Sequence, residues 1–282
     1  MTWCIAAVYK FTRLTDPGKT RDDIRQLAEA HGLCGTMLVA GEGINGTIAG
    51  SHNAIHAFLA TLTADCEIGA LAPKFSDAAE KPFAHLKVKL KPEIVTFGAP
   101  GSDPNVHVGQ YVAPEDWDRL IADPDVILID TRNSYEYAIG TFRGAIDPQT
   151  RNFREFPAYV AANLDPARHR KVAMFCTGGI RCEKATAYML SQGFEEVYHL
   201  DGGILNYLAK VPKERSSWRG ECFIFDERVS VDHDLKPGQY RLCATCGGPV
   251  DKTSPDDAAC PGCAMEAAAA GAGTATVSGR AR

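Results

Sequence analysis

The residue with the clearest chemical signature in this sequence is Cys176, which opens the segment Cys176-Thr177-Gly178-Gly179-Ile180-Arg181. Its two glycines let the backbone curl so that several N–H groups point inward and form an anion-binding nest. The helix predicted after the loop adds the partial positive charge of its N-terminus, and Arg181 adds a permanent one. All three effects favour a thiolate. The loop therefore predicts a nucleophilic Cys176 rather than a buried cysteine at the end of a strand.

A second thiol, Cys182, lies six residues after Cys176, in the first turn of the predicted helix. The curvature of the loop brings the two near each other, but a disulfide needs a defined separation that a sequence does not give. Two interpretations stay open. Cys182 is either a resolving thiol that forms a reversible disulfide with Cys176, or a residue that fills space.

Two C-x2-C pairs lie near the C-terminus, Cys243 with Cys246 and Cys260 with Cys263, and thirteen residues separate them. Four thiolates at this spacing satisfy tetrahedral zinc. Gly247-Gly248 suits a zinc knuckle, in which backbone amides turn toward the sulfurs. We therefore expect a structural zinc, and the alternative is four reduced surface thiols in a frayed tail.

The other cysteines and the N-terminus indicate the compartment. Ten cysteines without an export signal at Met1-Thr2-Trp3-Cys4 favour thiol chemistry or metal binding over a disulfide framework. Cys4, Cys34 and Cys66 are expected to be small core residues. No apolar run approaches the ~20 residues that span a bilayer. We expect a cytoplasmic protein with no membrane contact.

The bulk composition is that of a folded protein with more than one domain. A chain of 282 residues, 45% hydrophobic and 23% charged, suits two domains with real cores and a small appendage. Its net charge of −5 gives no global attraction for nucleic acid, so RNA contacts must come from local basic patches. Residues 264–282 have almost no apolar bulk and are expected to be disordered.

Residues 1–97 are expected to form a ferredoxin-like (acylphosphatase-like) α+β domain. The glycine-rich segment 41–46 allows a tight connection between two central strands. The order strand, helix, strand, strand, helix, strand is the split βαβ arrangement. The apolar periodicity predicts these elements at Cys4–Phe11, Asp22–His31, Thr36–Ala40, Thr47–Ala49, Ser51–Leu62 and Leu86–Leu90.

Three lysines, Lys87, Lys89 and Lys91, alternate with apolar residues in the last of these strands. Alternate strand residues repeat at ~7 Å, close to the spacing of phosphates, so these lysines are the leading candidates for RNA contact. Arg151 and Arg154 are further candidates. The alternative interpretation is an ordinary solvated sheet face.

Residues 98–121 are rich in turn formers at their start and are expected to be a linker and lead-in, followed by an α/β domain at 122–216. Apolar strands separated by helices imply a parallel sheet covered on both faces, with ligands beyond the carboxyl ends of its strands. Cys176 lies at that place. A small Cys-rich segment is expected at 217–263. The predicted elements are Val126–Asp130, Phe156–Leu164, Val172–Phe175, Glu183–Gln192, Val197–Leu200 and a short helix after Gly202-Gly203.

Three segments of the second domain resemble the signatures of the rhodanese family. The first is Asp130-Thr131-Arg132-Asn133-Ser134-Tyr135-Glu136, the second is the loop from Cys176 to Arg181, and the third runs from Gly193-Phe194 to Leu200-Asp201-Gly202-Gly203. The resemblance implies that Cys176 is the nucleophile and carries a persulfide. It also implies that the loop amides cradle the sulfur or a substrate oxyanion.

The chain from residue 3 to residue 246 resembles a narrower family, the rhodanese-domain tRNA uridine hydroxylases. The resemblance rests on Gly41–Thr47, on the loop followed by Cys182-Glu183-Lys184, and on Gly220–Phe223 with Val229–His233. These enzymes use molecular oxygen to make 5-hydroxyuridine at the wobble position. The resemblance implies a tRNA-modifying oxidoreductase whose partner is the anticodon stem-loop and whose co-substrate is oxygen. No nucleotide-binding fingerprint, iron triad or obligate protein partner is evident.

The mechanism stays open between two routes. A thiolate that adds to C6 of uracil makes C5 electron-rich toward oxygen, with the loop amides and Arg181 stabilising the oxyanion. Alternatively, Cys176 acts as a persulfide or redox relay. The rival enzyme class is a thiosulfate-type sulfurtransferase with a persulfide on Cys176. A third hypothesis, a binding module with a vestigial rhodanese domain, conflicts with the intact Cys176 and Arg181.

Overall fold

The structure is a computed structural model that describes residues 2–64, 67–226, 228–255, 260 and 263. It divides into two compact units, residues 1–109 with 183–193 and residues 110–182 with 194–282. Among the described residues, no helix is long and apolar enough to cross a membrane. The predictions for Cys66 and for residues 264–282 lie outside the described part of the chain.

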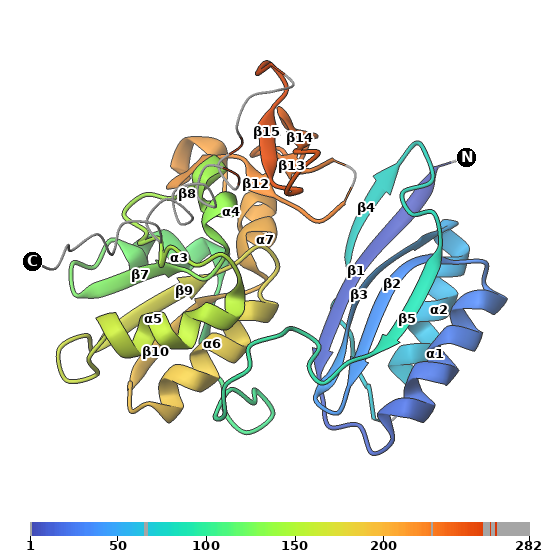
Figure 1. Cartoon of the computed structure of the whole chain (residues 1–282), viewed down its shortest axis with the longest axis horizontal. Helices are drawn as coiled ribbons and strands as arrows, with labels where there is room; N and C mark the ends of the chain where they lie inside the picture. Colours follow the sequence, from blue (N-terminus) through green and yellow to red (C-terminus); the bar gives the residue numbers. More distant parts are fainter. Residues whose placement is uncertain (1, 65–66, 227, 256–259, 261–262, 264–282) are drawn as a thin grey trace, which may run out of the picture. The chain divides into compact units, whose positions relative to one another are not determined.

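The first unit is built on a five-stranded sheet with the order β4-β1-β3-β2-β5 (Figure 1). Its apolar side chains, among them Ala6, Met37 and Ile48, form one buried cluster with residues of two helices. These helices cover one face of the sheet. The elements are β1 (Trp3–Phe11), α1 (Pro17–Ala30), β2 (Cys34–Ala40), β3 (Gly43–Gly50), α2 (His52–Ala64), β4 (Lys74–Ala78) and β5 (Leu86–Leu90).

The predicted ferredoxin-like class is confirmed, but its last strand lies elsewhere than expected. β5 pairs in parallel with β2 at one edge of the sheet, while β4 pairs antiparallel with β1 at the other. The sequence did not reveal β4 because none of its five residues is buried, which leaves no apolar alternation to detect. The strand predicted as the fourth is therefore a fifth, added beside β2.

The glycine-rich segment is a strand and not a long turn. β3 begins at Gly43, ahead of the predicted start at Thr47, and only Gly41-Glu42 form the turn. Gly43 has a φ of 143°, and a Cβ there would clash with the carbonyl oxygen of Lys10 on the neighbouring strand. These glycines thus allow close approach of backbones inside the sheet.

The second unit contains the predicted parallel sheet, with the order β6-β10-β9-β7. The strands and helices expected from the sequence are present, with boundaries shifted by a few residues. The strands are β6 (Gln110–Val112), β7 (Val126–Asp130), β9 (Lys171–Phe175) and β10 (Glu196–Leu200). The helices are α3 (Pro114–Ile121), α4 (Ser134–Ile139), α5 (Phe156–Asn163) and α7 (Gly203–Lys210). The helix α6 (Ile180–Ser191) begins in this unit, and its residues from Glu183 on belong to the first unit.

The segment expected to be a linker and lead-in, residues 98–121, contains regular structure. β6 pairs in parallel with β10, and Trp117 of α3 is fully buried in the core of the second unit. A strand of three residues is too short to show the alternation of apolar and polar residues that predicts a strand, so β6 was not predicted from the sequence.

The C-terminal segment shares the core of the second unit. β11 (Trp218–Gly220) pairs with β8 (Gly140–Phe142), and β12 (Cys222–Phe223) pairs with β13 (Ser230–Val231). Buried side chains of this segment, including Trp218 and Cys222, join Phe175 and Leu200 in one hydrophobic cluster. A last hairpin, β14 (Tyr240–Leu242) and β15 (Pro249–Asp251), carries the first C-x2-C pair in its turn.

Candidate active site and cysteine cluster

β9 delivers Cys176 to the carboxyl end of the parallel sheet, where the sequence placed it. Gly179 has a φ of 104°, a conformation that favours glycine, and its N–H donates to Cys176 Sγ at 3.1 Å. α6 then begins at Ile180. The inward-pointing amide that the two glycines predict is therefore present.

The first residues of α7 form hydrogen bonds with the loop that carries Cys176. The N–H groups of Ile204 and Leu205 donate to the carbonyl oxygens of Cys176 and Thr177, at 2.9 and 3.2 Å. Gly203 has a φ of 68°, and a Cβ there would clash with the Cys176 carbonyl oxygen. The close approach of α7 to the loop explains why the closing segment carries glycine at this position.

Opposing effects act on the Cys176 thiol. Burial raises its pKa, but a hydrogen bond from the Cys182 thiol, the charge of Arg181 and the N–H groups of Cys182 and Gly179 lower it. The lowering effects win, so the pKa of Cys176 lies well below that of an ordinary thiol. The arrangement favours a thiolate at neutral pH.

Cys182 has the opposite preference. Its side chain is fully buried, and its sulfur lies 3.5 Å from Thr131 Oγ1. Burial and the neighbouring sulfur of Cys176 raise the pKa of Cys182 well above the ordinary value. The surroundings therefore favour a thiolate on Cys176 and a protonated thiol on Cys182.

Arg181 is engaged by a partner that the sequence did not identify. Its Nη1 and Nη2 donate to the two carboxylate oxygens of Glu136 at 2.7 and 2.8 Å. Glu136 is fully buried and also accepts from the N–H of Asn133 at 3.0 Å. Because this pairing is bidentate, Arg181 acts on Cys176 through its charge, and its forked donors are not directed at a substrate oxyanion.

The first rhodanese signature has a structural role here. Arg132 and Asp130 form a fully buried ion pair at 2.6 Å, and Arg132 also donates to the carbonyl oxygen of Gly140 at 2.6 Å. Thr131 Oγ1 donates to the carbonyl oxygen of Phe175 at 3.0 Å. The Thr131 contact ties the end of β7 to the end of β9, next to the loop, and the Arg132 contact ties it to the start of β8.

The C-terminal segment reaches the loop. Thr177 Oγ1 donates to the carbonyl oxygen of Phe223 at 3.4 Å, and the Arg181 guanidinium lies 5.9 Å from the ring centroid of Phe225. The side chain of Cys176 has no exposed surface, whereas Phe225 is 67% exposed. Phe223 and Phe225 were not recognised as site residues, because their contacts span more than 40 positions in the sequence.

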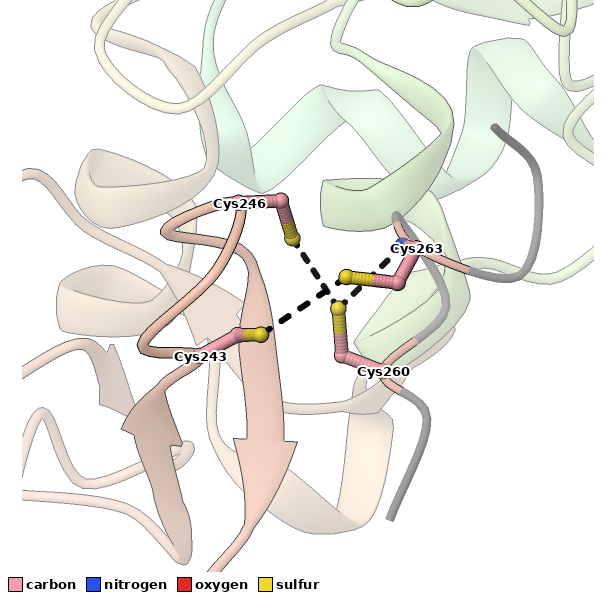
Figure 2. Close-up of side chains that lie close together, drawn as sticks. All are labelled: Cys243, Cys246, Cys260 and Cys263. Atoms are coloured by element: carbon pink, nitrogen blue, oxygen red, sulfur yellow. Dashed lines mark hydrogen bonds between the residues drawn. The ribbon is translucent and has the colours of Figure 1, made fainter. Parts of the chain in front are cut away.

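The four C-terminal cysteines converge, as Figure 2 shows. Their sulfurs all lie within 4.8 Å of one another. Cys243 and Cys263 are 3.8 Å apart at sulfur, and Cys246 and Cys260 are 3.0 Å apart. Sulfur ligands at ~2.3 Å from a tetrahedral zinc are separated by ~3.8 Å, so the cluster has nearly the required size.

Backbone amides turn toward these sulfurs. The N–H groups of Thr245, Gly248 and Cys263 donate to Cys243, Cys246 and Cys260 at 3.4, 3.4 and 3.3 Å. Gly247, with a φ of 73°, makes the turn between the first pair and β15. Such donors stabilise thiolate charge, as a metal–thiolate knuckle needs.

The basic residues predicted to contact RNA all lie at the surface. Lys87, Lys89 and Lys91 are exposed on and just after β5. Lys87 and Lys89 line a shallow depression of about 350 Å³ together with Arg25 of α1. In the other unit, Arg151 and Arg154 are exposed before α5.

Comparison with known proteins agrees with both halves of this architecture. Residues 3–94 match the UPF0176 acylphosphatase like domain, and residues 113–210 match the rhodanese-like domain. The tRNA uridine(34) hydroxylase of Teredinibacter turnerae is 54% identical to this chain, covering 93% of it and 83% of the relative. The enzyme of the same name from Picosynechococcus sp. is also 54% identical, covering 92% of this chain and 89% of the relative. The chain therefore belongs to the tRNA uridine(34) hydroxylase family.

Proposed function

We propose that this protein hydroxylates C5 of the wobble uridine, position 34 of tRNA, with molecular oxygen as co-substrate. The observation that carries the proposal is 54% identity to tRNA uridine(34) hydroxylases across both domains. The thiolate site at Cys176 supports it, since uracil C5 reacts with oxygen only after the ring becomes electron-rich. The protein acts where tRNA is found, in the cytoplasm.

Cys176 is the nucleophile in this proposal. Its thiolate adds to C6 of uracil, which places negative charge on C5 and the C4 carbonyl. Gly179 N–H and the charge of Arg181 hold the sulfur ready, and the ion pair with Glu136 holds Arg181 in place. Because Cys176 is buried, the base has to leave the stacked anticodon loop and displace the segment that carries Phe223 and Phe225.

The test is reconstitution of the reaction with purified components. Unmodified tRNA, air and a thiol reductant are expected to give 5-hydroxyuridine at position 34, detected by mass spectrometry of nucleosides and RNA fragments. A deletion strain is expected to lack the same nucleoside until the gene is restored. Reconstituted enzyme that binds tRNA but leaves uridine 34 unchanged under air would contradict the proposal.

A thiosulfate-type sulfurtransferase is the second candidate, because the rhodanese-like domain carries an intact loop cysteine. In that case the Cys176 thiolate would take the outer sulfur of thiosulfate, forming a persulfide and releasing sulfite, and cyanide would accept that sulfur as thiocyanate. Mass spectrometry of the thiosulfate-treated protein and a thiocyanate assay distinguish the two. Sulfur transfer without tRNA hydroxylation favours this candidate.

We also propose a structural zinc ion bound by Cys243, Cys246, Cys260 and Cys263. The proposal is supported by the size of the cluster and by the three N–H donors to its sulfurs. The protein prepared without chelator is expected to contain about one zinc per chain. Cys246→Ser should lose the metal without unfolding the two units. Metal-free protein, or a disulfide between Cys246 and Cys260 in the reduced preparation, would contradict the proposal.

A further inference from the structure

We infer that Cys176 and Cys182 act as a dithiol that supplies the two electrons for hydroxylation and becomes a disulfide in each turnover. The inference rests on the proposed function and adds an electron source and a second catalytic residue. It is carried by the place of the two fully buried cysteines in one loop, where Gly179 donates its N–H to Cys176 Sγ at 3.1 Å and accepts the N–H of Cys182 at 3.0 Å.

The stoichiometry requires a reductant. Inserting one oxygen atom of O2 into a C–H bond reduces the other atom to water, which takes two electrons and two protons. Two thiols release both when they form a disulfide. Uridine C5–H, O2 and two S–H groups thus become C5–OH, water and one S–S bond, and the atoms and electrons balance.

The first half of the reaction places oxygen on the base. The Cys176 thiolate forms a bond to C6, and the electrons of the C5–C6 double bond move toward C5 and the C4 carbonyl. C5 then bonds to O2, and the resulting peroxide takes a proton. Loss of the C5 proton expels the Cys176 thiolate and leaves a hydroperoxide on C5 with the double bond restored.

The second half uses both cysteines. Cys176 attacks the terminal oxygen of the hydroperoxide, the O–O bond breaks, and 5-hydroxyuridine departs from a sulfenic acid on Cys176. Cys182 attacks that sulfur, forms the S–S bond and releases water. A dithiol from solution then reduces the disulfide for the next turnover.

The position of Cys182 suits this role. Thr131 Oγ1 lies 3.5 Å from the Cys182 sulfur and donates at 3.0 Å to the carbonyl oxygen of Phe175, the residue before Cys176. Both cysteines are fully buried, so a thiol from solution is excluded while the base occupies the site. Cys222, another fully buried cysteine of this unit, is the matched control, since its sulfur lies 3.6 Å from the Phe223 carbonyl oxygen.

The experiment uses full-length enzyme that is reduced, freed of reductant without oxygen, mixed with tRNA and exposed to air. We expect one 5-hydroxyuridine and one Cys176–Cys182 disulfide per active chain, measured by nucleoside analysis and by peptide mapping after alkylation. Cys222→Ala should give the same two yields. Added dithiothreitol should restore repeated turnover.

Cys182→Ser should form no disulfide and should leave a sulfenic acid on Cys176 that dimedone traps. Its turnover at ~0.1 mM dithiothreitol is expected to fall roughly tenfold, because an internal thiol acts at an effective concentration of at least ~1 mM. Hydroxyuridine formed by the wild type with both thiols still free would overturn this inference and leave the proposed function standing. Wild-type enzyme that makes no hydroxyuridine even with excess reductant would overturn the proposed function, and the inference with it.

Discussion

The two groups of cysteines in the second unit differ in the environment of their sulfurs. Cys176 and Cys182 have no exposed surface, and their surroundings favour a thiolate on one and a thiol on the other. The four C-terminal cysteines lie in a turn and a neighbouring segment, where Cys246 is exposed and three sulfurs each accept one backbone N–H.

This difference separates a reactive thiol from a set of ligands. A cysteine nucleophile needs a sulfur that is charged at neutral pH, and the buried loop favours this on Cys176 while Cys182 stays protonated. A tetrahedral metal needs four sulfurs around one point, and the C-terminal cluster brings four sulfurs within 4.8 Å of one another. Cysteine spacing in the sequence indicates both groups, but only the surroundings distinguish their chemistry.

Cys176→Ser should have the largest effect on activity, because it removes the thiolate that distinguishes the loop from the C-terminal cluster. A serine hydroxyl keeps the shape of the loop, yet it stays protonated where the thiol ionises. We expect hydroxylation to fall by roughly a thousandfold or more, as when the nucleophile of an enzyme is removed. Nucleoside analysis under multiple-turnover conditions measures the loss.

Cys246→Ser is the control from the other group and should leave single-turnover hydroxylation largely intact. Full hydroxylation by Cys176→Ser, with normal tRNA binding, would show that the loop is a scaffold and that the chemistry lies elsewhere.

Arg181→Ala tests the charge that creates the asymmetry. The change leaves the Glu136 carboxylate buried without its bidentate partner, which typically costs ~3–5 kcal/mol of folding free energy. Part of the thiolate stabilisation is lost as well, while the Gly179 amide remains. Urea unfolding measures the stability, and the activity of the folded fraction should lie between the wild type and Cys176→Ser.

Arg181→Lys is the matched control, because it keeps the charge and loses the fork. It should keep the pKa of Cys176 lowered, but it should lose part of the folding free energy that the bidentate pairing with Glu136 contributes. Equal stability of Arg181→Ala and the wild type would show that the pairing with Glu136 contributes little.

The reactive loop could be predicted from the sequence because its determinants are local. An apolar strand, two glycines and an arginine close together along the chain define where Cys176 lies and what faces it. Its partners could not be predicted in the same way. Glu136 lies 45 residues before Arg181, and Phe225 comes from a segment whose place depends on packing of Trp218 and Cys222 in the rhodanese-like core.

The same reasoning explains the errors in the fold. β5 was recognised by its alternation, but its parallel pairing with β2 depends on a sheet edge that no local pattern describes. β4 was missed because an edge strand without buried residues has no periodic signal. The four cysteines of the C-terminal cluster were predicted from the sequence, but the positions of their sulfurs depend on the turn at Gly247 and Gly248.

The pH dependence of alkylation tests the protonation states directly. Cys176 has a lowered pKa, so its thiolate forms as the pH rises through a value well below the ~8.5 of a free thiol. Cys182 has a raised pKa, so its thiol should react only at a pH above the ~8.5 of a free thiol. Iodoacetamide labelling of each peptide against pH, read by mass spectrometry, gives the two profiles. Coincident profiles near 8.5 would remove the asymmetry on which the comparison depends.

Neither cysteine group is expected to set the affinity for tRNA. Changes to exposed lysines should therefore alter tRNA binding and not catalysis. Replacing Lys87, Lys89 and Lys91 by serine should weaken tRNA binding and leave the rate of the bound complex unchanged. For every lysine that binds a phosphate, its removal should reduce the slope of log affinity against log salt by about one. Arg13, Lys19 and Arg21 of the same unit form the charge-matched control. Each already pairs with an aspartate, so its net charge is locally compensated. A triple lysine variant with the affinity and salt slope of the wild type would identify the β5 surface as solvated and direct the search to Arg151 and Arg154.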